Sequence, residues 1–212
     1  MSPELLRRPV SMATDRREQI NRILTRAMER FKASFLLGGG TFYAQSVTFR
    51  DEITKFEVTP LQVKEYLFAV QYIGADGTDS IEVSVNPDKD IDIAQFQELV
   101  RQRYQPAAFQ EVLRRFLNSA DAALLGKEVE ELDSWFKIDP AADVTYEVKR
   151  KGEKSKRSGE FYDYIIRQRF RLNRRKLKSL LESEESFVAG VYYYCLKCFS
   201  AVFAEFMRSA KG

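Results

Sequence analysis

Basic side chains are concentrated between positions 149 and 178 of this 212-residue sequence. This stretch holds thirteen Lys and Arg residues against three Asp and Glu residues, a net charge of +10 in a chain whose formal total is +3. The remainder is therefore acidic, most of all residues 31–148, which hold 11 basic and 20 acidic side chains. A concentrated basic surface attracts polyanions even when the total charge is close to zero. Anion binding is thus the chemistry that this stretch predicts.

Three arginines, Arg167, Arg169 and Arg171, recur at every second position, and we call them the arginine row. A period of two is typical of a β-strand, so the three guanidinium groups are expected on one face, about 6.6 Å apart. That pitch is comparable to the spacing of successive phosphates along a nucleic-acid strand, and the planar Arg fork suits phosphate. The opposite face is expected to cover the core through Tyr162, Tyr164, Ile166, Phe170 and Leu172.

We therefore expect a non-catalytic binding module whose basic hairpin makes sequence-nonspecific contact with the nucleic-acid backbone. The predicted contact residues come from the arginine row, the loop before it and the helix after it: Arg167, Arg169, Arg171, Lys151, Lys154, Lys156, Arg157, Arg174 and Arg175. Two other interpretations of this charge stay open. The basic side chains are solvated or paired with acidic residues of the same chain, or they dock an acidic protein surface. A scaffold or assembly subunit is the alternative function class.

Few residues are suited to catalysis. The chain has no histidine, which removes the commonest general base and the commonest metal ligand. Its only cysteines, Cys195 and Cys198, supply two of the four ligands that structural zinc requires. Inside a helix they are about 5–6 Å apart at Cβ, too far for an unstrained disulfide. We expect two core cysteines, no metal, no cofactor, and a reducing, cytoplasmic location.

One short motif points to an enzyme. Glu147-Val148-Lys149 on a predicted strand, with Asp139 eight residues before Glu147, resembles the acidic and Glu-x-Lys arrangement of restriction-endonuclease-like nucleases. The resemblance implies that Asp139 and Glu147 hold Mg²⁺ and that Lys149 orients the attacking water. This chain departs from the pattern, because Asp139 precedes a proline and a second strand, instead of a helix, follows the motif.

Hydrophobic periodicity predicts an α+β fold, with a disordered leader at 1–13, a single domain over 14–212 and one candidate sub-boundary near 126–140. The predicted helices cover 14–37, a central pair within 92–126, a short third near 129–135, a basic helix at 173–181 and a long helix at 183–208. The predicted strands are 41–49, a short stretch around 56–58, 65–73, 80–86, 143–150 and 161–172. They predict an antiparallel sheet of about five or six strands.

The final predicted helix is apolar nearly all round, which is typical of a buried, dimeric or membrane helix. Lys197 lies near its middle, where a lysine costs about 3 kcal/mol on membrane-insertion scales. We therefore expect no membrane span. The helix is interpreted as a central core helix, with a homodimer seam as the alternative.

Overall fold

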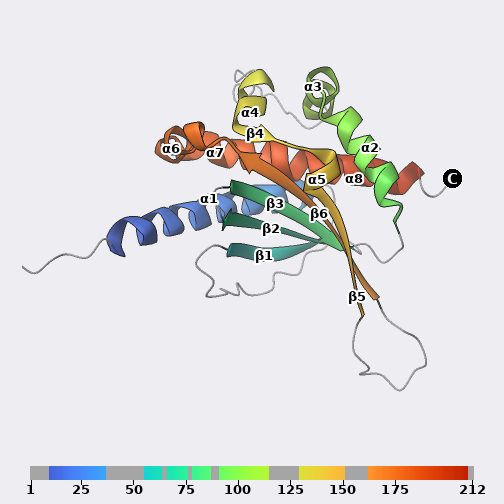
Figure 1. Ribbon diagram of the computed structural model, residues 1–212, viewed down its shortest axis with the longest axis horizontal. Helices are drawn as coiled ribbons and strands as arrows, with labels where there is room; N and C mark the ends of the chain where they lie inside the picture. The colour runs from blue at the N-terminus through green and yellow to red at the C-terminus, as the bar shows by residue number, and fades with distance from the viewer. Residues whose placement is uncertain are drawn as a thin grey trace, which may run out of the picture.

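The described strands form one antiparallel sheet (Figure 1). The structure is a computed structural model that describes residues 10–36, 55–63, 66–75, 78–86, 91–114, 129–150 and 162–209. Within these residues the sheet has six strands: β1 (Lys55–Val63), β2 (Tyr66–Ala75), β3 (Thr78–Asn86), β4 (Phe136–Lys137), β5 (Val144–Arg150) and β6 (Tyr162–Leu172). Their order is β1-β2-β3-β6-β4, and β5 pairs with β6 as well. The α+β prediction is confirmed.

Local sequence explains most of the strands. Both faces of β2 are apolar, which is typical of a strand inside a sheet, and β2 lies between β1 and β3. β3 buries Ile81, Val83 and Val85, as its alternation predicts. Pro60 does not end β1 but lies where the register with β2 shifts, between Val58 and Leu61. A proline is tolerated at such an irregularity on an edge strand because it has no amide to donate to the ladder. The predicted strand at 41–49 lies outside the described residues.

The helices follow the predicted order with two additions. They are α1 (Val10–Leu36), α2 (Ile93–Arg103), α3 (Pro106–Arg114), α4 (Val129–Trp135), α5 (Pro140–Asp143), α6 (Arg174–Glu182), α7 (Glu184–Gly190), η2 (Val191–Lys197) and α8 (Cys198–Ser209). Helix α1 begins at Val10, so the last residues of the predicted leader 1–13 are helical. Asp92 caps α2 by accepting from the amides of Ala94 and Gln95, as its spacing predicts. The additions are α5 and the π-helical segment η2.

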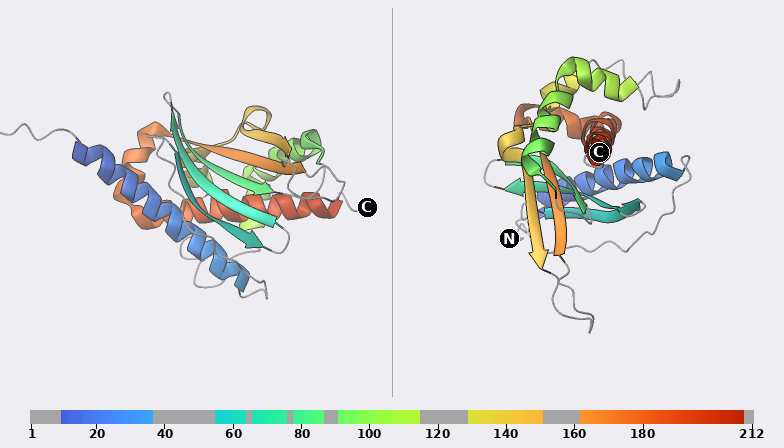
Figure 2. Two further views of the ribbon diagram at one scale, coloured as in Figure 1. Left: turned by 90° about the horizontal axis from the view of Figure 1, so that it is seen from below. Right: turned by 90° about the vertical axis from the view of Figure 1, so that its right-hand side faces the viewer.

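One face of the sheet is covered by α1 and by the C-terminal helix, which comprises α7, η2 and α8 (Figure 2). Phe68, on the covered face of β2, makes edge-to-face ring contacts with Phe31 of α1 and with Phe199 and Phe203 of α8. Helix α2 packs on α8 through Phe96, whose ring meets Phe199, Phe203 and Phe206. The C-terminal helix is therefore enclosed by the sheet, α1 and α2, and its all-round apolar pattern follows from that position.

The C-terminal helix is the core helix that its sequence predicts. It is the one described helix long and apolar enough to cross a membrane, and 83% of its apolar window is buried inside the fold. That burial is expected of the core helix of a water-soluble protein. Lys197, 9% exposed, places its ammonium 5.7 Å from the centre of the Tyr192 ring. The apolar residues that a homodimer seam would use pack within the chain.

Three consecutive tyrosines of the π-helical segment are buried. Tyr192 and Tyr193 lie under the Arg30 guanidinium of α1, at 4.7 and 5.1 Å from the ring centres. Tyr194 stacks on Phe136 of β4, with ring centres 5.1 Å apart. Just before the segment, a Cβ on Gly190 would lie 3.0 Å from Cε2 of Phe136, so the close approach of β4 favours glycine there.

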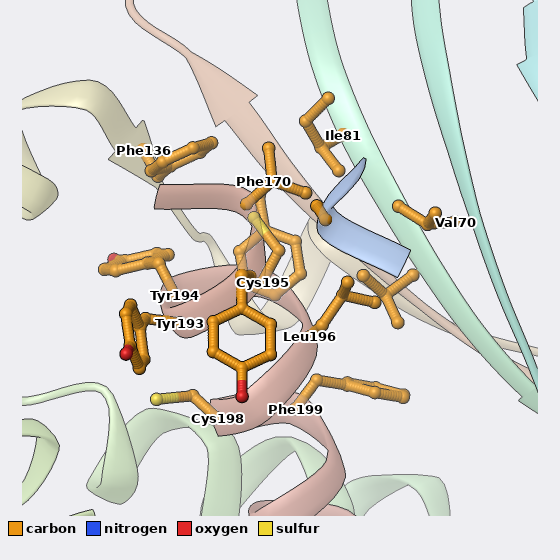
Figure 3. Packing of buried hydrophobic residues seen from close by; sticks show 14 of the residues in the cluster. Val70, Ile81, Phe136, Phe170, Tyr193, Tyr194, Cys195, Leu196, Cys198 and Phe199 are labelled. Carbon is orange, nitrogen blue, oxygen red and sulfur yellow. The ribbon is translucent and has the colours of Figure 1, made fainter. Parts of the chain in front are cut away.

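Both cysteines are expected to be unreactive in the native protein. Cys195 and Cys198 are free thiols in the core (Figure 3), and burial raises the pKa of each well above its ordinary value. Because the thiolate is the reactive form, an aromatic disulfide reagent should label them only as fast as the protein opens. The measurement is the absorbance of the released thiol with and without urea. Rapid labelling without urea would contradict the core position.

Candidate functional site

The arginine row lies on the face of the sheet opposite the helices. On β6, Ile166, Phe170 and Leu172 are buried on the helix-covered face, so the predicted alternation of this strand is confirmed at these positions. Gln168 shares that face and is also fully buried. On β3, the neighbour of β6, the residues of the opposite face include Ser80, Glu82 and Ser84. Glu82 therefore lies on the same face of the sheet as the arginines, on the neighbouring strand.

Glu82 holds two arginines of the row. Its side chain is 4% exposed, and it lies directly across the ladder from Arg169. Arg169 donates from Nη2 to Oε2 of Glu82 at 3.2 Å, and Nε of Arg167 is 3.6 Å from Oε1. Gln71 of β2 donates to the same carboxylate, and Arg167 also pairs with Glu147 of β5. A carboxylate that is buried without a cationic partner lowers the stability of the fold, so Glu82 requires these arginines.

Two further buried carboxylates engage the next arginines along the chain. Arg171 donates from Nε to Oδ1 of Asp143 at 2.9 Å, while the backbone amide of Asp139 donates to the other oxygen of Asp143 at 2.8 Å. Nε of Arg174 lies 3.4 Å from Oδ2 of Asp79. Asp79 therefore links α6 to β3. The guanidinium groups of Arg171 and Arg174 are each oriented by a buried carboxylate.

Asp79 also links α1 to the sheet. Its Oδ1 lies 3.4 Å from Nη2 of Arg16 and accepts from the hydroxyl of Tyr72. Burial raises the pKa of Tyr72, and the hydrogen bond to Asp79 raises it further. Tyr72 thus remains a neutral donor, and the charge of Asp79 is met by Arg16 and Arg174.

Internal pairing, one of the open interpretations, thus accounts for much of the arginine row. The row is still partly accessible to solvent, since the side chains of Arg167, Arg169 and Arg171 are 23%, 44% and 43% exposed. Their charge is largely compensated, however, so the surface over β6 is much less positive than its sequence indicates.

Uncompensated positive charge collects instead at one end of β6. An open hollow of about 660 Å³ lies between β4, the end of β6 and the start of α6, and we call it the basic hollow. Lys137, Arg171, Arg174 and Arg175 line it, together with one carboxylate, that of Asp139. Within the described part of the chain, Lys137 and Arg175 have no ion-pair partner. Of the predicted set, Arg171, Arg174 and Arg175 thus line the basic hollow, and Arg167 and Arg169 do not.

The chain at the start of α6 holds these cations in place. Asn173 caps the helix by accepting from the amide of Arg175 at 3.1 Å, and its side-chain nitrogen donates to the carbonyl of Ser134 at 3.2 Å. The amide of Asn173 donates to the carbonyl of Trp135 at 3.0 Å. These bonds fix α6 against the junction of α4 and β4, which is why Arg174 and Arg175 lie beside Lys137.

Lys137 was not among the predicted contact residues. It lies directly opposite Arg171 in the pairing of β4 with β6. Like charges directly opposite each other destabilise a strand pair, and a bound anion would relieve that repulsion. A two-residue strand has too little periodicity to be recognised in sequence, so no local signal marks Lys137.

The remaining residues named from the sequence have other roles or lie outside the described part of the chain. Lys151, Lys154, Lys156 and Arg157 lie outside the described residues. Of the nuclease-like set, Asp139 caps α5 by accepting from the amide of Ala141 at 3.1 Å, and Glu147 pairs with Arg167. In the described ranges no group of three or more His, Cys, Asp or Glu side chains is placed to hold a metal ion.

The arrangement is suited to holding an anion. Arginine and lysine side chains converge on one hollow, and three of them are arginines, whose planar forks match phosphate or carboxylate oxygens. In comparisons with known proteins, no family model, curated protein or solved structure matched this chain.

Proposed function

We propose that the protein binds nucleic acid through its phosphates and that the basic hollow is the centre of the contact. The observation that carries this proposal is the juxtaposition of Lys137 with Arg171 across β4 and β6, beside Arg174 and Arg175. Four cations around one open hollow, two of them without a carboxylate partner among the described residues, create a local excess of positive charge. Electrostatic attraction of this kind supplies most of non-specific nucleic-acid binding.

Neighbouring residues extend the same positive surface. Lys176 and Lys178 of α6 are exposed and have no ion-pair partner in the described structure. A strand held at the basic hollow would meet further cations on α6, as a polymer of phosphates requires.

The alternative, a scaffold that docks other proteins, receives less support. Stable protein interfaces usually expose apolar side chains at their centre. Among the residues whose exposure the structure describes, Val148 of β5 is the one large apolar side chain that is exposed, at 46%. A polyanion therefore fits the described surface better than a protein with an apolar interface.

Titrating salt against labelled single- and double-stranded oligonucleotides tests the proposal. If three or four phosphates are neutralised, the logarithm of the association constant should fall against the logarithm of the salt concentration with a slope between about −2 and −4. Fluorescence anisotropy measures this directly. Absence of binding at low salt would contradict the proposal and favour an acidic protein partner.

A further inference from the structure

The cations that line the basic hollow cluster around one place instead of following a line along the sheet. A site that tracks a nucleic-acid backbone needs cations spaced along it. On β6 that line is interrupted, because Glu82 compensates Arg169 and shares Arg167 with Glu147. What remains is the cluster around the basic hollow. A cluster of this kind matches a single anion that carries more than one charge.

The charge of the basic hollow fits a phosphomonoester better than a phosphodiester. Asp143 balances Arg171, Asp79 is shared by Arg174 and Arg16, and Asp139 offsets one further charge, whereas Lys137 and Arg175 have no ion-pair partner in the described structure. The five cations therefore exceed the three carboxylates by two charges. A backbone phosphodiester carries one negative charge, whereas a phosphomonoester carries about 1.5 to 2 at neutral pH. An excess of two positive charges therefore favours the monoester.

The other walls of the basic hollow suit the nucleotide to which such a phosphate is attached. Ile138 and Leu172 supply apolar surface beside the cations, and Asp139 supplies an acceptor for a sugar hydroxyl or a base amino group. The volume of about 660 Å³ lies within the range of roughly 300–1,000 Å³ that small-molecule sites occupy. One terminal nucleotide is small enough to enter such a hollow, and a continuous duplex backbone has no need of it.

We propose that the basic hollow binds the terminal phosphomonoester of a nucleic-acid strand, with Lys137 and Arg175 as the residues that distinguish a phosphorylated end from a hydroxyl end. This inference rests on the proposed nucleic-acid binding and adds to it the part of the polymer that is recognised. Arg171 and Arg174, held from behind by Asp143 and Asp79, line the same hollow and are the further ligands of the phosphate.

The test compares one labelled single strand in three forms: with a 5′-phosphate, with a 3′-phosphate and with hydroxyls at both ends. We expect one phosphorylated form to bind about tenfold more tightly than the hydroxyl form, equivalent to about 1.4 kcal/mol. The preference should shrink as the pH falls from about 7.5 to about 5, because the second pKa of the monoester is about 6. Anisotropy at constant ionic strength measures all three affinities.

A matched pair of variants of α6 locates the effect. Arg175→Gln should remove most of the preference for the phosphorylated end, because Arg175 lines the basic hollow. Lys178→Gln changes the charge of the same helix by the same amount, at a position that does not line the hollow. It should weaken the binding of all three forms equally and so preserve the preference. Neither side chain has an ion-pair partner in the described structure, so thermal melting should show both variants folded.

The outcomes separate this inference from the proposed function. Equal, salt-dependent binding of all three forms overturns the terminal-phosphate site and leaves nucleic-acid binding in place. No binding of any form overturns both. Inorganic phosphate that binds as tightly as the phosphorylated strand would assign the hollow to free phosphate and also overturn the inference. Loss of the preference in Lys178→Gln would contradict the assignment to the basic hollow.

Discussion

Replacing Arg167 and Arg169 together by Ser should lower the free energy of unfolding by about 2–4 kcal/mol. The cause is the carboxylate that the arginines leave behind. Glu82 is buried at 4% side-chain exposure, and without its two cations it keeps only the amide of Gln71 as a described donor. The expected loss is below that of a fully buried pair because the two arginines are themselves partly exposed. Urea unfolding followed by circular dichroism gives the measurement.

Two controls separate this mechanism from a general effect of lost charge. Adding Glu82→Gln to the double variant should recover most of the lost stability, because the buried side chain is then a neutral amide that needs no cationic partner. Arg175→Ser with Lys178→Ser removes two exposed cations that have no partner in the described residues, and should change the unfolding free energy by less than about 0.5 kcal/mol. An Arg167→Ser, Arg169→Ser protein of unchanged stability would mean that the arginine row is not structural. It would then be available for nucleic acid, as its sequence predicts.

Reversing the charges of Lys137 and Arg175 to Glu should weaken nucleic-acid binding by roughly 10–100-fold near physiological salt and flatten the salt slope by about two. Both side chains are exposed and have no carboxylate partner in the described structure, so the reversal removes attraction and adds repulsion at little cost in stability. Anisotropy titrations at several salt concentrations give the affinity and the slope together.

The reversal can also be made at Lys137 alone. Arg208→Glu is the matched control for that single variant, Lys137→Glu. Arg208 is exposed near the end of α8, remote along the C-terminal helix from α6, and its reversal changes the net charge by the same two units. We expect this control to weaken binding by less than about threefold, since distant exposed charges are screened by salt. Equal losses in the two variants would contradict a localised site and indicate a diffuse charge effect.

Much of the fold could be predicted because its signals are local. The alternation of Ile81, Val83 and Val85 marked β3, and the spacing of Asp92 from Gln95 marked the start of α2. The missed elements carry no such signal. Two residues of β4 and four of α5 are too few for a period to appear. The π-helical segment lies in a stretch that is apolar on all sides, so a change in helical phase leaves no trace in the sequence.

The candidate site was predictable only in part, for a different reason. The sequence alone determined that positive charge is concentrated at 149–178 and that the arginine row shares one face of a strand, because both depend on composition and on period two. Which of those arginines are compensated was decided by the tertiary structure. Glu82 and Arg169 are 87 positions apart in the chain, and the antiparallel register of β3 with β6 sets them side by side. In the same way, the pairing of β4 with β6 brings Lys137 to Arg171 and moves the uncompensated charge to the basic hollow. A charge pattern is a property of residue order, whereas charge compensation depends on distance, and only folding brings remote residues close enough to pair.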